Sequence, residues 1–325
     1  MRHVPVLLQQ VLEGLRISDL KSQSVYVDCN LGDGGHTEAV IEKTKGDITV
    51  IGFDLDSEAI ERAKEHIQKR VGEEQKKDSS FKTPKLHFVN TNFRHFKKSL
   101  REIEEVTTKP IHPDAILFDL GISSYEIDES GRGFSFRKEE PLHMTFGTPA
   151  SHAFTAYDIV NTWDEENIAD IIYGYGEDTY ARRIAKAIVE AREKVTKDGE
   201  VVGTKIKTTT ELAEIVKKAY PSFKRHGRIH PATKTFQALR IAVNDELRSI
   251  EEAVPQAFES LAPGGRLAVI SFHSLEDRII KRYFKEKIDG GEAMVVTKKP
   301  IVPEDSEIEA NPRSRSSKLR IIQKI

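Results

Sequence analysis

The stretch Val25-Tyr-Val-Asp-Cys-Asn-Leu-Gly-Asp-Gly-Gly-His36 decides the fold that we expect for this chain. It begins with apolar residues typical of a buried strand, continues into a glycine-rich turn, and leads to a helix that opens at Thr37. Glycine accepts positive φ angles and lets backbone amides approach a ligand closely. The stretch therefore predicts a ligand site at the carboxyl end of a strand, and a tight turn without a ligand is the alternative.

A second strand ends in an acid at a distance that indicates a nucleoside ligand. Asp54 closes the apolar run Ile-Thr-Val-Ile-Gly-Phe and lies about 20 residues after Gly32, where an acid contacts ribose hydroxyls in dinucleotide-binding folds. Thr37 stands where a dinucleotide fingerprint needs its third glycine. Asp28, just before the glycines, suits a cationic ligand better than a pyrophosphate. These features favour S-adenosylmethionine over NAD.

The composition is that of an ordinary globular protein. The chain has 325 residues, 38% hydrophobic and 31% charged, with a formal net charge of −2. This net charge argues against a globally basic nucleic-acid-binding protein, so any such binding must come from local patches. No apolar run approaches the ~20 residues of a membrane span, and the first residues do not resemble a signal or transit peptide, so we expect a cytoplasmic protein. A single cysteine, Cys29, excludes a disulfide framework and is expected to be a buried filler.

Strands and helices alternate after the second strand. Four apolar residues recur at helical spacing after Asp54, namely Ile60, Ala63, Ile67 and Val71, and the polar residues 72–84 are expected to form a loop. Further strands are expected at residues 86–90, 114–121, 262–274, 294–297 and 318–323, the last two as a hairpin. Seven strands, five of them with a parallel pattern, predict a doubly wound α/β sheet that binds ligands at the carboxyl ends of its strands.

The alternation stops in the middle of the chain. Between residues 124 and 224 we find no convincing strand, and helices are expected at 163–193 and 208–220. We therefore expect an inserted all-helical domain at 124–224 that shapes substrate access, with residues 1–123 and 225–325 forming the two parts of the sheet domain. A long helix that starts near Pro231 and is bent or ended by Pro255 leads back to the sheet.

Several further motifs, read in order, resemble those of the RsmH (MraW) family. They are His3-Val-Pro-Val-Leu-Leu, the loop from Gly32 to His36, Asp119-Leu-Gly-Ile-Ser-Ser, Arg132-Gly-Phe-Ser-Phe, Tyr175-Gly-Glu-Asp, the run from His230 to Leu247, Ile270-Ser-Phe-His-Ser-Leu-Glu-Asp-Arg and Asn311-Pro-Arg-Ser-Arg-Ser-Ser. The resemblance spans nearly the whole chain. It implies a Rossmann-like class I methyltransferase fold, with a seven-stranded, mostly parallel sheet. It also implies methyl transfer from S-adenosylmethionine to the N4 amine of a cytidine in 16S rRNA of the small ribosomal subunit.

The resemblance also implies which residues contact the cofactor. These are Gly34, Gly35, His36, Asp54, Phe93, Asp119 and Glu126, the last of which replaces the usual glutamine. Strand one is followed by Asp28-Cys-Asn in place of the usual Asp-Gly-Thr, and the loop 141–147 lacks two acids and an arginine of the family pattern. Two alternatives therefore stay open, namely a methyltransferase of another RNA or of DNA, and a cofactor-binding ribosome-assembly factor without turnover.

Methyl transfer from a sulfonium asks mainly for positioning and for an acceptor of the amine proton. Asp119, at the end of the fourth strand, is the first candidate acceptor. His273 is a second catalytic candidate, and a hydrogen-bonded structural histidine is its alternative. Aromatic residues that could stack on a flipped base are Tyr125, Phe134 and Phe136, unless they pack in a core. No spacing of histidines or acids indicates a metal site.

Two basic clusters could contact RNA phosphates. One contains Lys224, Arg225, Arg228 and Lys234, and the other contains Arg313 and Arg315. Each could also be a solvated face. Since the clusters flank the returning helix and the last strand, we expect phosphate contacts. The sequence does not indicate an oligomeric state.

Overall fold

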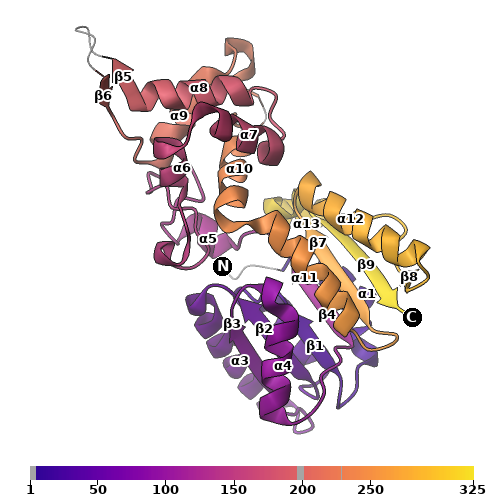
Figure 1. The fold of residues 1–325 in the computed structure, drawn as a ribbon. Coiled ribbons are helices and arrows are strands. Elements are labelled where there is room, and N and C mark those ends of the chain that lie inside the picture. Colours follow the sequence, from indigo (N-terminus) through magenta and orange to yellow (C-terminus); the bar gives the residue numbers. More distant parts are fainter. Residues whose placement is uncertain (1–4, 196–200, 228) are drawn as a thin grey trace. The chain divides into compact units, whose positions relative to one another are not determined.

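The computed structural model describes residues 5–195, 201–227 and 229–325. These form two compact units: unit 1 comprises Met1–Gly121 and Leu247–Ile325, and unit 2 comprises Ile122–Glu246 (Figure 1). Each has its own hydrophobic core and is described by itself. No helix in the described part of the chain is long and apolar enough to cross a membrane.

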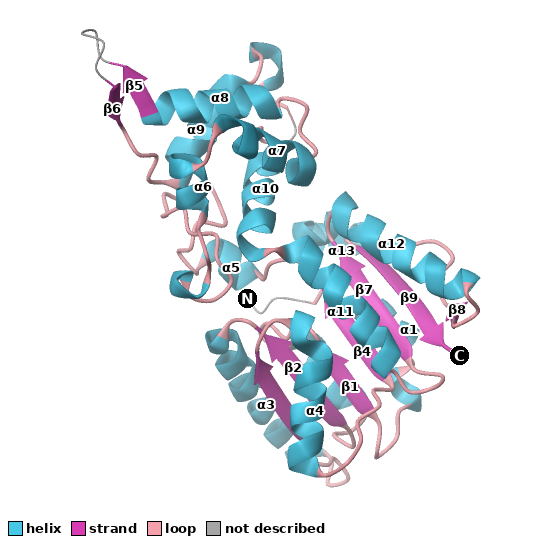
Figure 2. Cartoon of the chain, in the orientation of Figure 1, coloured by secondary structure: helices cyan, strands magenta, loops and turns pink. Residues whose placement is uncertain are grey.

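Unit 1 contains a seven-stranded sheet. Its strands are β1 (Val25–Asp28), β2 (Thr49–Asp54), β3 (Lys85–Asn90), β4 (Ala115–Asp119), β7 (Arg266–Ser271), β8 (Ala293–Val295) and β9 (Lys318–Lys324). They lie in the order β3-β2-β1-β4-β7-β9-β8. The first five are parallel to one another, whereas β9 is antiparallel to both β7 and β8. The predicted sheet of mostly parallel strands is confirmed (Figure 2).

Helices pack on both faces of this sheet. They are α1 (Leu8–Gly14), α2 (Gly35–Lys43), α3 (Ser57–Lys77), α4 (Phe96–Thr107), α11 (Glu246–Ser260) and α12 (Ser274–Asp289). A further short helix, α13 (Asp305–Ala310), lies between β8 and β9 in the chain and has no buried residue. Successive strand residues point to opposite faces. Val27 and Phe118 accordingly pack in one core with residues of α4, α11 and α12, while Tyr26 and Leu117 pack in another core with residues of α1, α2 and α3. Sheet and helices thus form the doubly wound layer structure that the sequence predicts.

Helix α3 is longer than expected. Its predicted apolar face is buried, but the helix continues through Gly72 to Lys77, so the prediction of a loop from residue 72 was wrong. Charged residues stabilise this last part, because Glu74 pairs with Arg70 at 3.5 Å and with Lys77 at 2.8 Å.

Unit 2 is mostly helical. It contains α5 (Ser124–Asp128), α6 (Ala156–Thr162), α7 (Glu165–Gly176), α8 (Ala181–Arg192), β5 (Glu193–Val195), β6 (Val201–Gly203), α9 (Thr209–Ala219) and α10 (Ala232–Asn244). Strands β5 and β6 pair antiparallel. The prediction of an all-helical insertion was therefore wrong. Valines at 195, 201 and 202, on either side of Asp198-Gly199, carried the overlooked hairpin signal.

The helix expected to return the chain to the sheet is divided in two. Helix α10 ends at Asn244, and Asp245 takes the left-handed conformation (φ 50°) that commonly terminates helices. Pro255 lies inside α11 and does not end it. Helix α10 packs on α7 and α9, so residues 225–246, which we expected in the sheet domain, belong to unit 2.

Candidate active site

Three of the predicted acids lie at one edge of the unit 1 sheet. β1 has β2 on one side and β4 on the other, so the strand order reverses beside β1. In open α/β sheets, ligands bind at such a switch point, outside the carboxyl ends of the strands. Asp28, Asp54 and Asp119 are the last residues of β1, β2 and β4. The site predicted from the sequence therefore lies where the topology favours a ligand.

The glycine loop links β1 to α2. Gly32 and Gly34 have positive φ angles of 52° and 82°, which glycine adopts without strain. A Cβ atom on Gly35 would lie 2.6 Å from Cγ of Pro5, so close packing also requires glycine there. Gly34 is the N-cap of α2 and gives no side-chain cap. The N-terminus of α2 thus presents its amides and its positive dipole end toward anionic groups.

Asp54 holds the glycine loop in place. Its Oδ2 accepts a hydrogen bond from the Gly32 amide at 2.8 Å, and its Oδ1 accepts one from the Asp56 amide at 2.8 Å. Burial raises the pKa of Asp54 to about 6, although these two hydrogen bonds act to lower it. Each carboxylate oxygen retains further acceptor capacity, so Asp54 can support the loop and also bind a hydroxyl.

Asp28 fastens β1 to α2. It is 1% exposed and accepts hydrogen bonds from Thr37 Oγ1 at 2.8 Å, from the Asn30 amide at 3.2 Å and from the Tyr26 hydroxyl at 3.4 Å. Burial raises the pKa of Asp28 to about 6. Sequence reasoning missed Thr37 and Tyr26, although both flank the loop. The neighbouring Cys29 is buried as expected, and burial raises its thiol pKa.

Asp119 faces a histidine whose ring orientation can be deduced. His36 Nε2 lies 3.0 Å from the carbonyl oxygen of Val6. Because a carbonyl oxygen can only accept, Nε2 must carry the proton of this hydrogen bond. His36 Nδ1 then turns toward Asp119, 3.6 Å from its Oδ2. The His36 side chain is thus held by Val6 and Asp119, which leaves its backbone amide at the N-terminus of α2 as the group for a cofactor contact.

The surroundings of Asp119 favour a ligand that carries positive charge or donates a hydrogen bond. Burial raises the pKa of its carboxyl well above the usual range, and the nearby carboxylates Asp28 and Glu276 raise it further. Its Oδ1 is buried and has no hydrogen-bond partner among the described residues. A buried carboxylate oxygen without a donor is costly, so a ligand that donates a hydrogen bond or brings positive charge would stabilise it.

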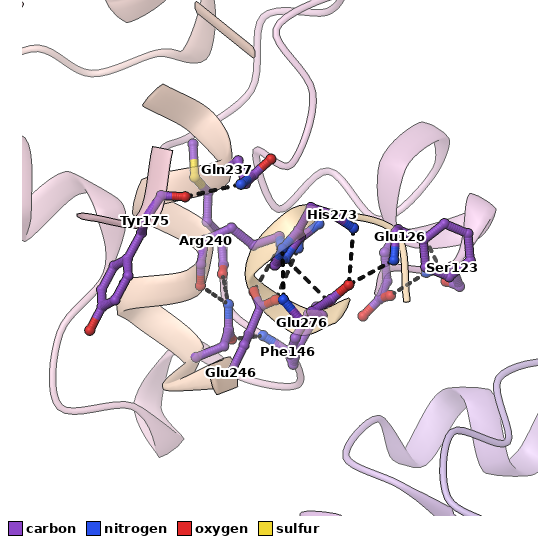
Figure 3. A network of polar contacts seen from close by, with 12 residues as sticks. Ser123, Glu126, Phe146, Tyr175, Gln237, Arg240, Glu246, His273 and Glu276 are labelled. Carbon is purple, nitrogen blue, oxygen red and sulfur yellow. Dashed lines mark hydrogen bonds and ion pairs between the residues drawn. The ribbon is translucent and has the colours of Figure 1, made fainter. Parts of the chain in front are cut away.

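His273 forms a helix cap in unit 1. It is the N-cap of α12, and its Nδ1 accepts the Glu276 amide at 3.4 Å. In return, Glu276 Oε2 accepts the amides of Phe272 at 2.7 Å and His273 at 3.2 Å (Figure 3). Glu276 is 1% exposed. These contacts match the structural alternative for His273, and its catalytic role stays a prediction.

Phe93 and Glu126 belong to different units. Phe93 opens a 3₁₀ helix (Phe93–His95) after β3, with its ring edge-on to Phe118 at 5.5 Å between centroids. Glu126, in unit 2, completes a capping box: its Oε2 accepts the Ser123 amide at 2.8 Å, and its own amide donates to Ser123 Oγ at 3.1 Å (Figure 3). Glutamine closes such a box equally well, so the cap is compatible with either residue at this position.

The aromatic candidates in unit 2 pack against other rings. Phe134 is buried and stacks on Phe146, with centroids 5.5 Å apart. Phe136 lies 4.7 Å from the His230 ring and 4.9 Å from the Phe236 ring. Core packing therefore accounts for both phenylalanines. Tyr125, on α5, is only partly buried.

The altered loop 141–147 is anchored in unit 2. Leu142 and Met144 are buried in its core. Asn244 Nδ2 donates to the Met144 carbonyl at 2.7 Å, and Asn244 Oδ1 accepts the Phe146 amide at 2.7 Å. The loop thus has a defined conformation without the acids and arginine of the family pattern.

The basic candidates differ in how they are held. Arg225 donates to the carbonyls of Tyr220 at 2.9 Å and Lys218 at 2.8 Å. Lys234 Nζ donates to the Glu177 carbonyl at 2.8 Å, and Lys224 Nζ lies 5.2 Å above the Tyr180 ring. Arg313 and Arg315 lie in a 3₁₀ helix (Pro312–Ser316) before β9. Arg228 lies outside the described residues.

An acidic site at the switch point of a seven-stranded, mostly parallel sheet is the arrangement of a class I methyltransferase, as predicted. The chain belongs to the MraW methylase family, whose model matches residues 1–325. It is 40% identical over 340 residues to "Ribosomal RNA small subunit methyltransferase H" of Paenibacillus sp. (strain JDR-2), covering 100% of this chain and 99% of that protein. The protein of the same name from Clostridioides difficile (strain 630) is 40% identical over 338 residues, covering 99% of both. The chain is therefore a methyltransferase, and the family implies S-adenosylmethionine as its methyl donor.

Proposed function

We propose that this protein transfers a methyl group from S-adenosylmethionine to the exocyclic N4 amine of a cytidine in 16S rRNA, in the decoding region of the small ribosomal subunit and hence in the cytoplasm. The names of its relatives support an rRNA substrate. One observation carries the chemistry: Asp119 ends β4 at the switch point, with a buried Oδ1 that no described residue satisfies. Such an oxygen suits both a cationic cofactor and the N–H of an amine.

The residues present fit the cofactor. When bound, S-adenosylmethionine supplies a methyl group that its sulfonium charge activates for transfer. In our proposal, Asp54 binds ribose hydroxyls, Phe93 lies on the adenine, and the amides of Gly35 and His36 bind the methionine carboxylate at the N-terminus of α2. The Gly34 amide donates to the Leu31 carbonyl at 2.8 Å, so Gly34 contributes by forming the turn against which the cofactor lies. Glu126 remains a candidate contact from unit 2. The acids at the carboxyl edge of the sheet favour the positive charges of the ligand.

Asp119 is the proposed proton acceptor. A cation beside Asp119 favours its ionised form and counteracts the burial that raises its pKa. The ionised carboxylate orients the N–H of the cytosine amine and takes up the proton that the nitrogen loses as it gains the methyl group. With Nε2 donating to the Val6 carbonyl, His36 holds the ionised carboxylate when its Nδ1 is protonated as well, because a neutral Nδ1 and a carboxylate oxygen are both acceptors. This chemistry requires no metal ion.

Mapping methylated cytidine in 16S rRNA tests this function. A strain that lacks the gene should lose one N4-methylcytidine that the parent strain contains. Purified protein with S-adenosylmethionine should restore it on small subunits from the mutant strain. Label on another RNA or on DNA would favour a different substrate. Cofactor binding without transfer to any of these substrates, together with defective subunit assembly in the mutant strain, would favour an assembly factor.

A further inference from the structure

One segment of unit 2 carries charge of a single sign. Residues 215–244 contain no aspartate or glutamate. Their described basic residues are Lys217, Lys218, Lys224, Arg225, Lys234 and Arg240. Lys217 pairs with Glu214 at 3.8 Å and Arg240 with Glu246 at 2.8 Å, so the charge that these acids do not offset is that of Lys218, Lys224, Arg225 and Lys234. The segment includes the end of α9, the 3₁₀ helix η4 (Ser222–Lys224) and the whole of α10. Local positive charge of this kind attracts a polyanion even in a chain with a negative net charge.

An aromatic side chain lies exposed within this basic segment. Phe223, in the middle of η4, is 80% exposed. Single exposed apolar residues are common on protein surfaces, so exposure alone indicates nothing. Phe223 differs because cations surround it in sequence: Lys224 and Arg225 follow it directly, and Lys218 precedes it on the last turn of α9.

The turn that carries Phe223 is held rigidly. The Lys224 amide donates to the Pro221 carbonyl at 2.9 Å. The Arg225 guanidinium links the turn to the end of α9 through its hydrogen bonds to the Lys218 and Tyr220 carbonyls. The Tyr220 and Tyr180 rings lie 4.8 Å apart, with Lys224 Nζ over the Tyr180 ring. The backbone that carries Phe223 is therefore held by hydrogen bonds before a ligand binds, which limits the cost of ordering this turn on binding.

We propose that Phe223 stacks on an unpaired nucleobase of the RNA substrate, while Lys224 contacts the adjoining phosphates. This inference rests on the proposed function, because it takes the substrate to be RNA. Proteins recognise single-stranded nucleic acid by combining aromatic platforms with positive charge along the backbone, and η4 offers both. Because the segment is positively charged, a partner without negative charge is a less favourable ligand for Phe223 than RNA.

Unit 2 contains a matched control. Tyr173, on α7, is also an exposed aromatic residue, at 66%. Its neighbours at helical spacing are Glu166, Asp170 and Glu177, and residues 164–180 contain no lysine or arginine. Negative charge there repels phosphates. Tyr173 thus has an exposed aromatic ring among acids of its own helix, whereas Phe223 has cations next to it in sequence; α7 nevertheless packs on α10, and the Glu177 carbonyl accepts a hydrogen bond from Lys234.

The experiment measures binding of the full-length protein to small ribosomal subunits from a strain that lacks the gene, across a range of salt concentrations. Phe223→Ala should weaken binding roughly 5- to 150-fold, the range for one stacked base, without changing the salt dependence. Phe223→Trp should retain binding. Lys224→Ala should lower the log–log salt slope by about one. Tyr173→Ala should bind like the parent protein.

Several results would overturn the proposal. They are parental affinity in Phe223→Ala, a loss in Tyr173→Ala as large as that in Phe223→Ala, or loss of binding in Phe223→Trp equal to that in Phe223→Ala. Unchanged cofactor affinity, measured by calorimetry, shows that unit 1 is folded in each variant, and parental helix content and thermal unfolding, measured by circular dichroism, show that unit 2 is folded. A parent protein that binds the cofactor but no ribosomal RNA would instead refute the proposed function, so the two failures are distinguishable.

Discussion

The carboxyl edge of the unit 1 sheet and the basic segment of unit 2 are electrostatic opposites. At the sheet edge, Asp28 and Glu276 are each 1% exposed, and burial raises the pKa of Asp28, Asp54 and Asp119. In residues 215–244 the charge is positive, and Phe223 is exposed. The formal net charge of −2 is a sum over the whole chain and indicates neither the acidic sheet edge nor the basic segment. Local charge, and not net charge, therefore indicates which ligand each region attracts.

The difference also concerns how each region is stabilised. The sheet edge buries several carboxyls of like charge, which disfavour each other's ionisation until a cation or a hydrogen-bond donor arrives. In the basic segment, Arg225 and Lys234 already donate to backbone carbonyls of their own unit. We expect the sheet edge to respond strongly to its ligand and to pH, and the basic segment to respond mainly to salt.

Asp119→Asn, at the sheet edge, should cause the largest loss of cofactor affinity and of methyl transfer. The amide keeps the shape of the side chain but removes its charge and its ability to take up a proton. We expect a large fall in S-adenosylmethionine affinity and, at saturating cofactor, a fall in single-turnover methyl transfer toward the range of about 10²–10⁴-fold typical of acid–base groups. Calorimetry and single-turnover assays separate the two losses.

Asp56→Asn is the matched control for this substitution. Asp56 is also a buried acid of unit 1, but it caps α3 by accepting the Glu58 amide at 3.0 Å. Asparagine is an equally good N-cap, so transfer at saturating cofactor should be retained; the one expected change is a lower pKa of Asp54, because the charge of Asp56 helps to raise it. An Asp119→Asn protein with parental affinity and parental transfer would remove Asp119 from the mechanism.

The pH dependence of cofactor binding sharpens the contrast. Since the pKa values of Asp28 and Asp54 are raised to about 6, both acids are largely neutral at pH 5 and ionised at pH 7. Affinity for the cationic cofactor should therefore rise as pH rises through about 6. Below that pH, each acid whose ionisation favours the cofactor should change the affinity by up to about tenfold per pH unit. The unliganded protein should show the opposite trend, because a raised folded-state pKa contributes stability that is lost as pH rises through that pKa.

Calorimetric titrations between pH 5 and pH 7, with thermal unfolding in parallel, measure both trends. S-adenosylhomocysteine lacks the sulfonium charge and should show a weaker pH dependence than S-adenosylmethionine. Equal affinity of S-adenosylmethionine across this range would show that these acids do not sense its charge.

Most of the unit 1 fold could be predicted because its signals are local. Apolar runs ending in Asp28, Asp54 and Asp119, with amphipathic helices between them, identify parallel strands and bring those acids to one edge. The errors also have local causes. The charged end of α3 resembles a loop until its pairs around Glu74 are counted, and the break at Asp245 has no proline or glycine to mark it.

The finer structure of the site could not be predicted, because its partners are distant in sequence. The bond between His36 and Val6 shows that Nε2 is protonated, and the influence of Glu276 on Asp119 depends on how α12 packs beside β7, the strand next to β4. For His273 the sequence offers a hydrogen-bonded structural histidine as the alternative, but the helix cap and the Glu276 side chain that completes it are seen only in the structure. Motifs indicate which residues matter, whereas packing determines their protonation and contacts.

The smallest expected effect comes from a basic patch within unit 1 itself. Arg313 and Arg315 lie on the 3₁₀ helix before β9, and Arg315 is exposed. If both contact phosphates, changing them together to alanine should weaken RNA binding several-fold and lower the log–log salt slope by roughly two, about one unit for each lost contact. Cofactor affinity should not change. Lys98→Ala, at an exposed lysine of α4, is the control and should leave the slope unaltered. An unchanged slope in the double variant would identify these arginines as solvated surface and would assign the measured phosphate contacts to unit 2, which makes the contrast between the two regions sharper.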